Sequence, residues 1–260
     1  MSNNLRAKRI IIIGGATGIG LAAAQKLLDE GAESIVLASR GLDKLKKAQE
    51  SLKRSSKQNV FVAQFDISKV DTHDQFIRDA AKMIGEIPDG LVISSGVNFG
   101  GSNWRGFNIS EADWDRVMDI NLKGVFFLMR NFANYLHGNQ VKGNICIVSS
   151  ISAHRDMLSV YQVTKNAISG IVHAYGKHLC ERGIVLNCVE PGTTNTDMMK
   201  NLAEYTDGVR PGKAWGDNSI HRLIRPEEIA DVIAFLMSDV SEVLSGSCVL
   251  AGGGCKSIAR

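Results

Sequence analysis

Short runs of β-branched residues alternate with longer segments of helical periodicity along almost the whole chain. This alternation is typical of repeated β–α–β units around a parallel sheet. The predicted strands are 9–13, 34–39, 60–64, 90–94, 143–149, 184–189 and 247–250. The predicted helices are 19–30, 42–53, 72–84, 111–136, 161–181 and 226–237. The pattern therefore predicts an α/β fold, a Rossmann-like doubly wound sheet of about seven parallel strands with helices on both faces.

One long stretch, about 193–225, lacks clear periodicity. A loop of that length in a compact domain is usually a functional lid or a disordered segment. It contains several apolar side chains: Met198, Met199, Leu202, Tyr205 and Trp215. We expect a lid over a partly apolar substrate, within a single domain covering 1–260, because 260 residues with 44% hydrophobic and 22% charged side chains suit one large core.

Charge and cysteine content exclude several classes of function. A net charge of +3 is too small to indicate a nucleic-acid surface. The five cysteines form no C-x-x-C pair and read as small core residues in a reducing, cytoplasmic compartment. The isoleucine run 10–13 is far too short for a membrane span, and the histidines form no metal-ligand motif. We therefore expect no nucleic-acid partner, no membrane and no metal.

The first predicted strand leads directly into a glycine-rich turn and then a helix. The turn is Gly14-Gly15-Ala16-Thr17-Gly18-Ile19-Gly20. Glycines allow a pyrophosphate to approach the backbone, while free N–H groups and the helix dipole favour its negative charge. The sequence therefore predicts dinucleotide binding here, with Gly14, Thr17, Gly18, Ile19 and Gly20 as candidate contacts.

The end of the second predicted strand indicates which dinucleotide binds. NAD-binding domains often place an acid about 20 residues after the glycine turn, against the ribose hydroxyl, whereas a 2′-phosphate requires a cation. Here the residues are Ser39 and Arg40, a hydroxyl donor and a planar guanidinium fork. We predict NADP rather than NAD, the alternative being that Arg40 is only a solvated loop residue.

Tyr161 and Lys165 are four residues apart, so they share one face of a predicted helix. A positive charge held near a phenol favours the phenolate and makes tyrosine a usable acid or base. The spacing alone also fits a solvated lysine one turn from a half-buried aromatic ring.

Further motifs appear in a fixed order along nearly the whole chain. They are the glycine turn, Asp66-Ile67 after the third strand, Asn121, Val148-Ser149-Ser150, Tyr161 with Lys165, and Pro191-Gly192 followed by Thr196. In this order they resemble the short-chain dehydrogenase/reductase family. The chain departs from the family after the fourth strand, where Ile93-Ser94-Ser95-Gly96 replaces N-N-A-G. The resemblance implies further cofactor contacts at Asp66, Ile67, Ser95, Gly96, Tyr161, Lys165, Pro191, Gly192, Thr194 and Thr196.

The resemblance also implies a catalytic set. Tyr161 would transfer the proton, and Lys165 would lower its pKa and hold the nicotinamide ribose. Ser150 would orient the substrate oxygen, and Asn121 would position a water that links Lys165 to solvent. The gap from Ser150 to Tyr161 is 161 − 150 = 11 residues, about two shorter than in the family. That shorter gap leaves Ser149 open as the active-site serine.

The sequence therefore predicts an NADP-dependent oxidoreductase that interconverts a ketone and a secondary alcohol on a small molecule. The alternatives are an NAD-dependent alcohol dehydrogenase and a non-catalytic dinucleotide-sensing regulator. Relatives commonly form homotetramers, so we expect a homo-oligomer, a tetramer or a dimer. Substrate identity and the physiological direction are left open by the sequence.

Overall fold

The computed structural model describes residue 5 and residues 8–53, 59–98, 109–154, 159–198 and 218–255. It contains a seven-stranded parallel sheet in the order β3-β2-β1-β4-β5-β6-β7,. The strands are β1 (Arg9–Ile13), β2 (Ser34–Ser39), β3 (Asn59–Gln64), β4 (Gly90–Ile93), β5 (Gly143–Val148), β6 (Ile184–Pro191) and β7 (Cys248–Ala251). The predicted doubly wound α/β fold is confirmed.

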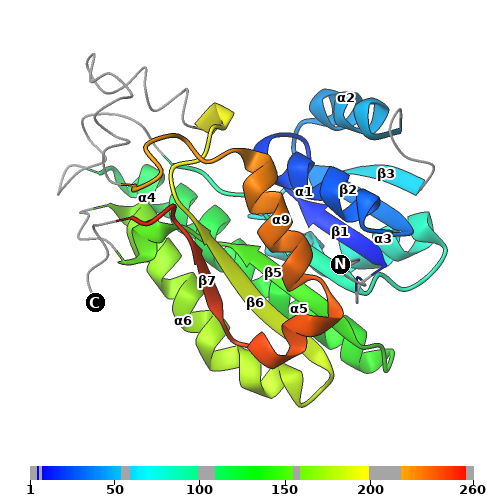
Figure 1. The fold of residues 1–260 in the computed structure, drawn as a ribbon. Coiled ribbons are helices and arrows are strands. Elements are labelled where there is room, and N and C mark those ends of the chain that lie inside the picture. The colour runs from blue at the N-terminus through cyan, green and yellow to red at the C-terminus, as the bar shows by residue number, and fades with distance from the viewer. Residues whose placement is uncertain are drawn as a thin grey trace.

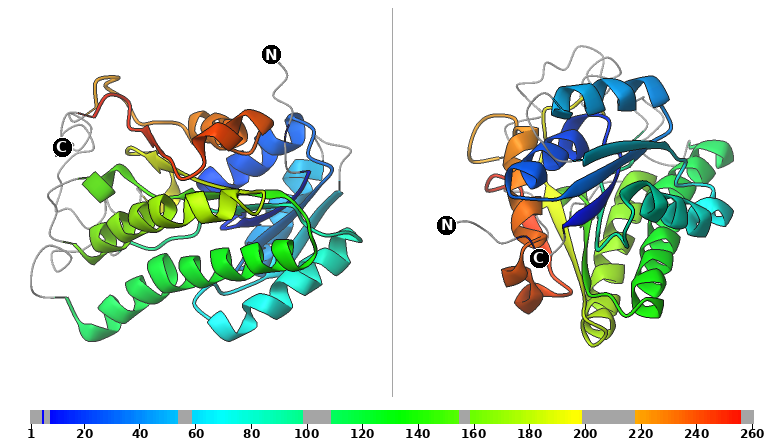
Figure 2. Two further views of the ribbon diagram at one scale, coloured as in Figure 1. Left: turned by 90° about the horizontal axis from the view of Figure 1, so that it is seen from below. Right: turned by 90° about the vertical axis from the view of Figure 1, so that its right-hand side faces the viewer.

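Helices cover both faces of this sheet (Figures 1 and 2). One layer holds α1 (Gly18–Asp29), α2 (Leu42–Lys53) and α9 (Pro226–Leu236). The other holds α3 (His73–Ile84), α5 (Gly124–Gly138) and α6 (Val160–Cys180). In strand β1, Ile10 and Ile12 pack into the first layer, whereas Ile11 and Ile13 pack into the second. Both faces of the strand are therefore buried, which explains its continuous run of isoleucines.

The predicted helix 111–136 is divided in the structure. It forms α4 (Glu111–Met118), a π-helical segment (Asp119–Lys123) and then α5. A Cβ on Gly124 would lie 2.4 Å from the carbonyl oxygen of Ile67, so α5 runs against the loop after β3. The π-helical turn accompanies this tertiary backbone contact, so the hydrophobic periodicity of the sequence could not predict it.

Strand β6 is two residues longer than predicted and reaches Pro191, with all eight residues buried. Short 3₁₀ helices follow β5 (Ile151–His154) and α9 (Asp239–Leu244). Of the predicted lid, only 193–198 and 218–225 are among the described residues, and a bridge from Thr194 to Ile224 joins these two parts. None of the helices in the described ranges is long and apolar enough to cross a membrane.

Candidate active site

A cleft of about 380 Å³ opens at the carboxyl ends of the strands. It spans the place where β1 has β2 on one side and β4 on the other, which is the usual ligand site of an open parallel sheet. The cleft brings together residues that are scattered along the sequence. Its lining includes Gly14, Thr17, Gly18, Ile19, Ser39, Arg40, Asp66, Ile67, Ser95, Gly96, Ser149, Ser150, Tyr161, Lys165, Pro191, Gly192, Thr194 and Thr196.

The glycine turn after β1 makes the middle of this cleft fit a pyrophosphate. Gly14 has a φ of +79°, and a Cβ there would lie 2.9 Å from the backbone of Ser94 and Ser95. Thr17 precedes α1 with extended backbone, and its side chain forms no capping hydrogen bond. The first N–H groups of α1 are therefore left for an anionic ligand.

Gly20 is a predicted contact that does not line the cleft. A Cβ at this position would lie 2.3 Å from the carbonyl oxygen of Gly14. Gly20 instead lets the first turn of α1 pack directly on the glycine turn, so its effect on a ligand is exerted through the backbone.

Ser39, Arg40 and Asp66 line the cleft on the β2–β3 side of the glycine turn. Burial raises the pKa of Asp66, but hydrogen bonds from the Ser68 hydroxyl (2.8 Å) and amide (3.0 Å), with Arg40 nearby, lower it overall. Arg40 is exposed, and within the described ranges its guanidinium forms no ion pair. This free cation fits a phosphate group at the adenosine end.

Tyr161 and Lys165 both face the cleft from the first turns of α6, which Ser159 caps by accepting from the amide of Gln162. Lys165 Nζ donates to the carbonyl oxygen of Val148 (3.0 Å) and lies 5.4 Å from the centroid of the Tyr161 ring. Burial lowers the pKa of Lys165 to about 8. The ammonium is therefore held at the cleft by one carbonyl partner and the face of the ring.

The predicted acidification of Tyr161 is not found in this structure. Burial raises the pKa of Tyr161, and a hydrogen bond with Ser150 opposes the rise only in part. Burial is the larger of the two effects, so the pKa of the Tyr161 hydroxyl lies above its ordinary value. Tyr161 is therefore a neutral phenol here, the form that can donate a proton.

The two serines after β5 differ in their surroundings. Ser149 is buried and its Oγ donates to the backbone carbonyl of Lys165 (3.2 Å). The side chains of Ser150 and Tyr161 form a hydrogen bond. Ser150 Oγ also accepts a hydrogen bond from the amide of Ser152 (3.1 Å). Ser150 and Tyr161 thus point two hydroxyl groups at one part of the cleft.

Asn121 lies behind the cleft, fully buried in the π-helical segment. Its Oδ1 accepts from the amide of Val97 and its Nδ2 donates to the carbonyl of Val97, both at 2.8 Å. A Cβ on Gly96 would meet Asn121 Oδ1 at 3.6 Å and Lys165 Nζ at 3.8 Å. Asn121 therefore holds the backbone of Val97, in the segment after β4, close to the Lys165 ammonium.

Several lining residues were not predicted from sequence. Phe65, Val97, Ile151 and Ser152 line the cleft, and each follows closely on the carboxyl end of β3, β4 or β5. That position was their only signal. Trp215 and the other apolar residues of the predicted lid, except Met198, lie outside the described residues.

Comparison with known proteins agrees with this geometry. The family model for short chain dehydrogenase matches residues 8–207. Among curated relatives, Dehydrogenase/reductase SDR family member 4 of Bos taurus is 29% identical, covering 97% of this chain and 88% of its own. L-rhamnose 1-dehydrogenase (NADP(+)) of Thermoplasma acidophilum is also 29% identical, covering 96% and 97%.

A solved dehydrogenase/reductase from Sinorhizobium meliloti 1021 has the same fold. It superposes with a TM-score of 0.85 at 25% identity, covering 97% of this chain and 96% of its own. The family match spans most of the chain and includes the glycine turn, the β5 serines and the Tyr161–Lys165 pair. The chain therefore belongs to the short-chain dehydrogenase family and is an NAD(P)-dependent oxidoreductase acting on CH–OH groups of small molecules.

Proposed function

We propose that this chain is an NADP-dependent oxidoreductase that interconverts a ketone and a secondary alcohol, with Tyr161 as the acid and base. The dinucleotide would supply the hydride. The observation that carries the proposal is the pair of hydroxyl groups of Ser150 and Tyr161 beside the buried Lys165 ammonium, at the nicotinamide end of a cleft fitted for a dinucleotide.

The protein residues have separate roles in this proposal. Ser150 donates a hydrogen bond to the substrate oxygen, where negative charge develops during reduction. Neutral Tyr161 gives that oxygen its proton, and Lys165 stabilises the phenolate that remains. Asn121 acts through the backbone of Val97 and the neighbouring Lys165. Residues 193–225 would form the substrate lid, and Met198 of this segment lines the cleft.

Preference for NADP over NAD is supported by Arg40. An exposed guanidinium with no ion pair in the described ranges, next to the Ser39 hydroxyl, offers donors to a 2′-phosphate. One relative at 29% identity carries NADP(+) in its name. NAD carries no 2′-phosphate, so its binding would gain nothing from that cation.

Titration with NADPH and NADH tests the cofactor assignment. We expect the wild type to bind NADPH more tightly, and Arg40→Ala to lose about 10- to 100-fold in NADPH affinity, because a charge-assisted bond to phosphate contributes about 1.5–3 kcal/mol. NADH affinity should not change. Lys47→Ala, which removes an exposed cation of α2 that does not line the cleft, is the control. An unchanged NADPH-to-NADH ratio in Arg40→Ala would favour the NAD-dependent alcohol dehydrogenase.

Separate alanine variants test the serine assignment. Ser150→Ala should lower kcat by roughly 10²-fold or more, because it removes a donor to the developing oxyanion. Ser149→Ala should keep most of its turnover and lose only a little stability, since Ser149 Oγ bonds to a backbone carbonyl. Loss of turnover confined to Ser149→Ala would reverse the assignment.

A further inference from the structure

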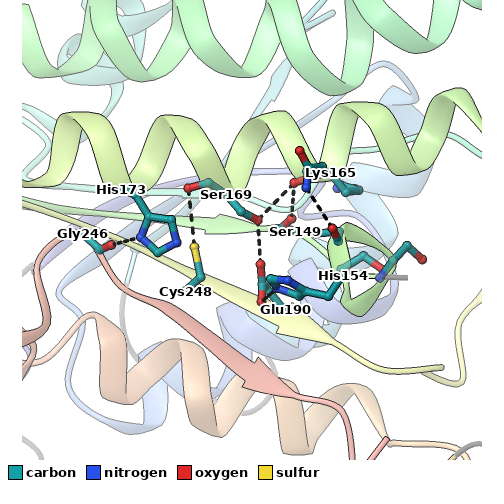
Figure 3. Close-up of polar contacts among 12 residues, drawn as sticks. Ser149, His154, Lys165, Ser169, His173, Glu190, Gly246 and Cys248 are labelled. Atoms are coloured by element: carbon teal, nitrogen blue, oxygen red, sulfur yellow. Dashed lines mark hydrogen bonds and ion pairs between the residues drawn. The ribbon is translucent and has the colours of Figure 1, made fainter. Parts of the chain in front are cut away.

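A buried carboxylate lies outside the proposed reaction. Glu190 is only 1% exposed, in the extended end of β6. Ser169 Oγ donates to its Oε1 (2.6 Å), and His154 Nε2 lies 2.7 Å from its Oε2. Figure 3 shows Glu190 between these two side chains, beneath α6. A carboxylate this deeply buried is costly unless charged or polar partners surround it.

Two thiols converge on the same carboxylate. Cys188 precedes Glu190 by two residues, so both side chains leave β6 on the face under α6. Cys248 is the register partner of Cys188 on the neighbouring strand β7. The sulfur atoms of Cys188 and Cys248 and a carboxylate oxygen of Glu190 all lie within 4.8 Å of one another. Both cysteines are free thiols.

We propose that Cys188, Cys248 and Glu190 form a zinc site, with His154 as the fourth ligand. Two sulfur ligands with one nitrogen and one oxygen suit Zn²⁺, whereas Mg²⁺ and Ca²⁺ require oxygen ligands. Zinc–sulfur bonds of about 2.3 Å in a tetrahedral site separate two sulfurs by about 3.8 Å. The ligand atoms of Cys188, Cys248 and Glu190, all within 4.8 Å of one another, therefore need to approach by about 1 Å. His154 lies outside this close group and would have to turn toward the ion.

A neighbouring hydroxyl group holds the Glu190 carboxylate in position. Ser169 Oγ fixes Oε1 of Glu190, which leaves Oε2 free to bind the ion once His154 turns from Oε2 to the metal. Each thiol would lose its proton to solvent as its bond to zinc forms. Entry is possible from the sheet edge, because β7 is an outer strand, Cys248 is only partly buried and the His154 side chain is 34% exposed.

The ion would have a structural role. With four protein ligands there is no open position for a substrate, as in other closed zinc sites. It would connect β6, β7 and the 3₁₀ helix that contains His154. Its ligand Glu190 directly precedes Pro191 and Gly192, which line the cleft. The sequence predicts no metal, because these ligands come from three separate segments and form no local motif.

Cobalt substitution tests the proposal directly. Full-length protein is stripped with chelator, titrated with Co²⁺, and followed by the absorption band of thiolate-to-cobalt charge transfer; zinc content after Zn²⁺ loading is measured by mass spectrometry. We expect about one ion per chain. Cys188→Ser and Cys248→Ser should lose the band, and Glu190→Gln should weaken binding by about 10-fold or more.

Cys146→Ser is the matched control, because Cys146 is equally buried but packs into the opposite layer of the sheet. It should bind Co²⁺ like the wild type. Zinc should also raise the melting temperature of the wild type and of Cys146→Ser but not of Cys248→Ser. If Cys188→Ser does not fold, Cys248→Ser at the sheet edge gives the same comparison. Wild type that takes up no cobalt, or uptake that both Cys248→Ser and Glu190→Gln retain, would overturn the proposal.

Discussion

At the scale of single residues, burial of the Lys165 ammonium in the cleft lowers the stability of the folded state. This ammonium is buried and has a backbone carbonyl and an aromatic face as partners, so its pKa falls from 10.5 to about 8. The folded state therefore binds its proton less tightly than the unfolded state. Below about pH 8 both states carry the charge, and the folded state bears the cost of burying it.

We expect Lys165→Met to abolish turnover and yet to stabilise the fold at neutral pH. A shift from 10.5 to about 8 corresponds to about 3 kcal/mol, from which the lost bond to Val148 subtracts about 1 kcal/mol. Unfolding in urea at about pH 7 should show a gain of about 2 kcal/mol, and the gain should shrink as the pH rises from about 8 to 10.5. A variant that is less stable than the wild type at neutral pH would contradict this account.

Single residues were predicted well where a motif specifies them and poorly where the environment decides. Tyr161, Lys165 and Ser150 were found by spacing and order, and they meet at the cleft. The raised pKa of Tyr161 depends on burial, which outweighs the hydrogen bond with Ser150. The contacts of Glu190 with Ser169 and His154 join residues 21 and 36 positions away, which no local pattern encodes.

Among the elements, the glycine turn and α1 are in very close contact. The first turn of α1 lies directly on the backbone of Gly14, and Gly20 makes that approach possible. This contact fixes where the free N–H groups of α1 point, and therefore where a pyrophosphate could bind.

Gly20→Ala should accordingly destabilise the fold by about 1–3 kcal/mol and weaken dinucleotide binding, because a Cβ 2.3 Å from the Gly14 oxygen must displace backbone. Gly170→Ala is the matched control. Gly170 is an exposed residue inside α6, and a Cβ there would have no atom within 4 Å. It should stabilise α6 by up to about 1 kcal/mol. Equal effects of the two substitutions on unfolding in urea would show that the close contact at Gly20 is unimportant.

Element boundaries followed the hydrophobic pattern except where backbone contacts intervene. The bounds of β1, β2 and α2 agree with prediction, since their ends coincide with glycine or polar residues. The division of 111–136 into α4, a π-helical segment and α5 was missed, because the approach of Gly124 to Ile67 is a tertiary contact.

For the whole molecule, the alternation of strand and helix was sufficient to predict a doubly wound parallel sheet, and the strand order then places the cleft. Assembly is a different matter. The predicted homo-oligomer, a tetramer or a dimer, stays a prediction, because it depends on surfaces that meet other copies of the chain.

The central claim is that this cleft transfers hydride between NADP and a carbonyl carbon with Tyr161 as the acid. The most direct measurement is NADPH oxidation with a panel of ketones, by wild type and Tyr161→Phe, with NADPH binding followed by fluorescence in both. We predict that the wild type turns over at least one ketone, and that Tyr161→Phe binds NADPH but loses about 10²-fold or more in kcat. Turnover by Tyr161→Phe at the wild-type rate, or a wild type that binds NADPH and reduces no ketone, would contradict the account.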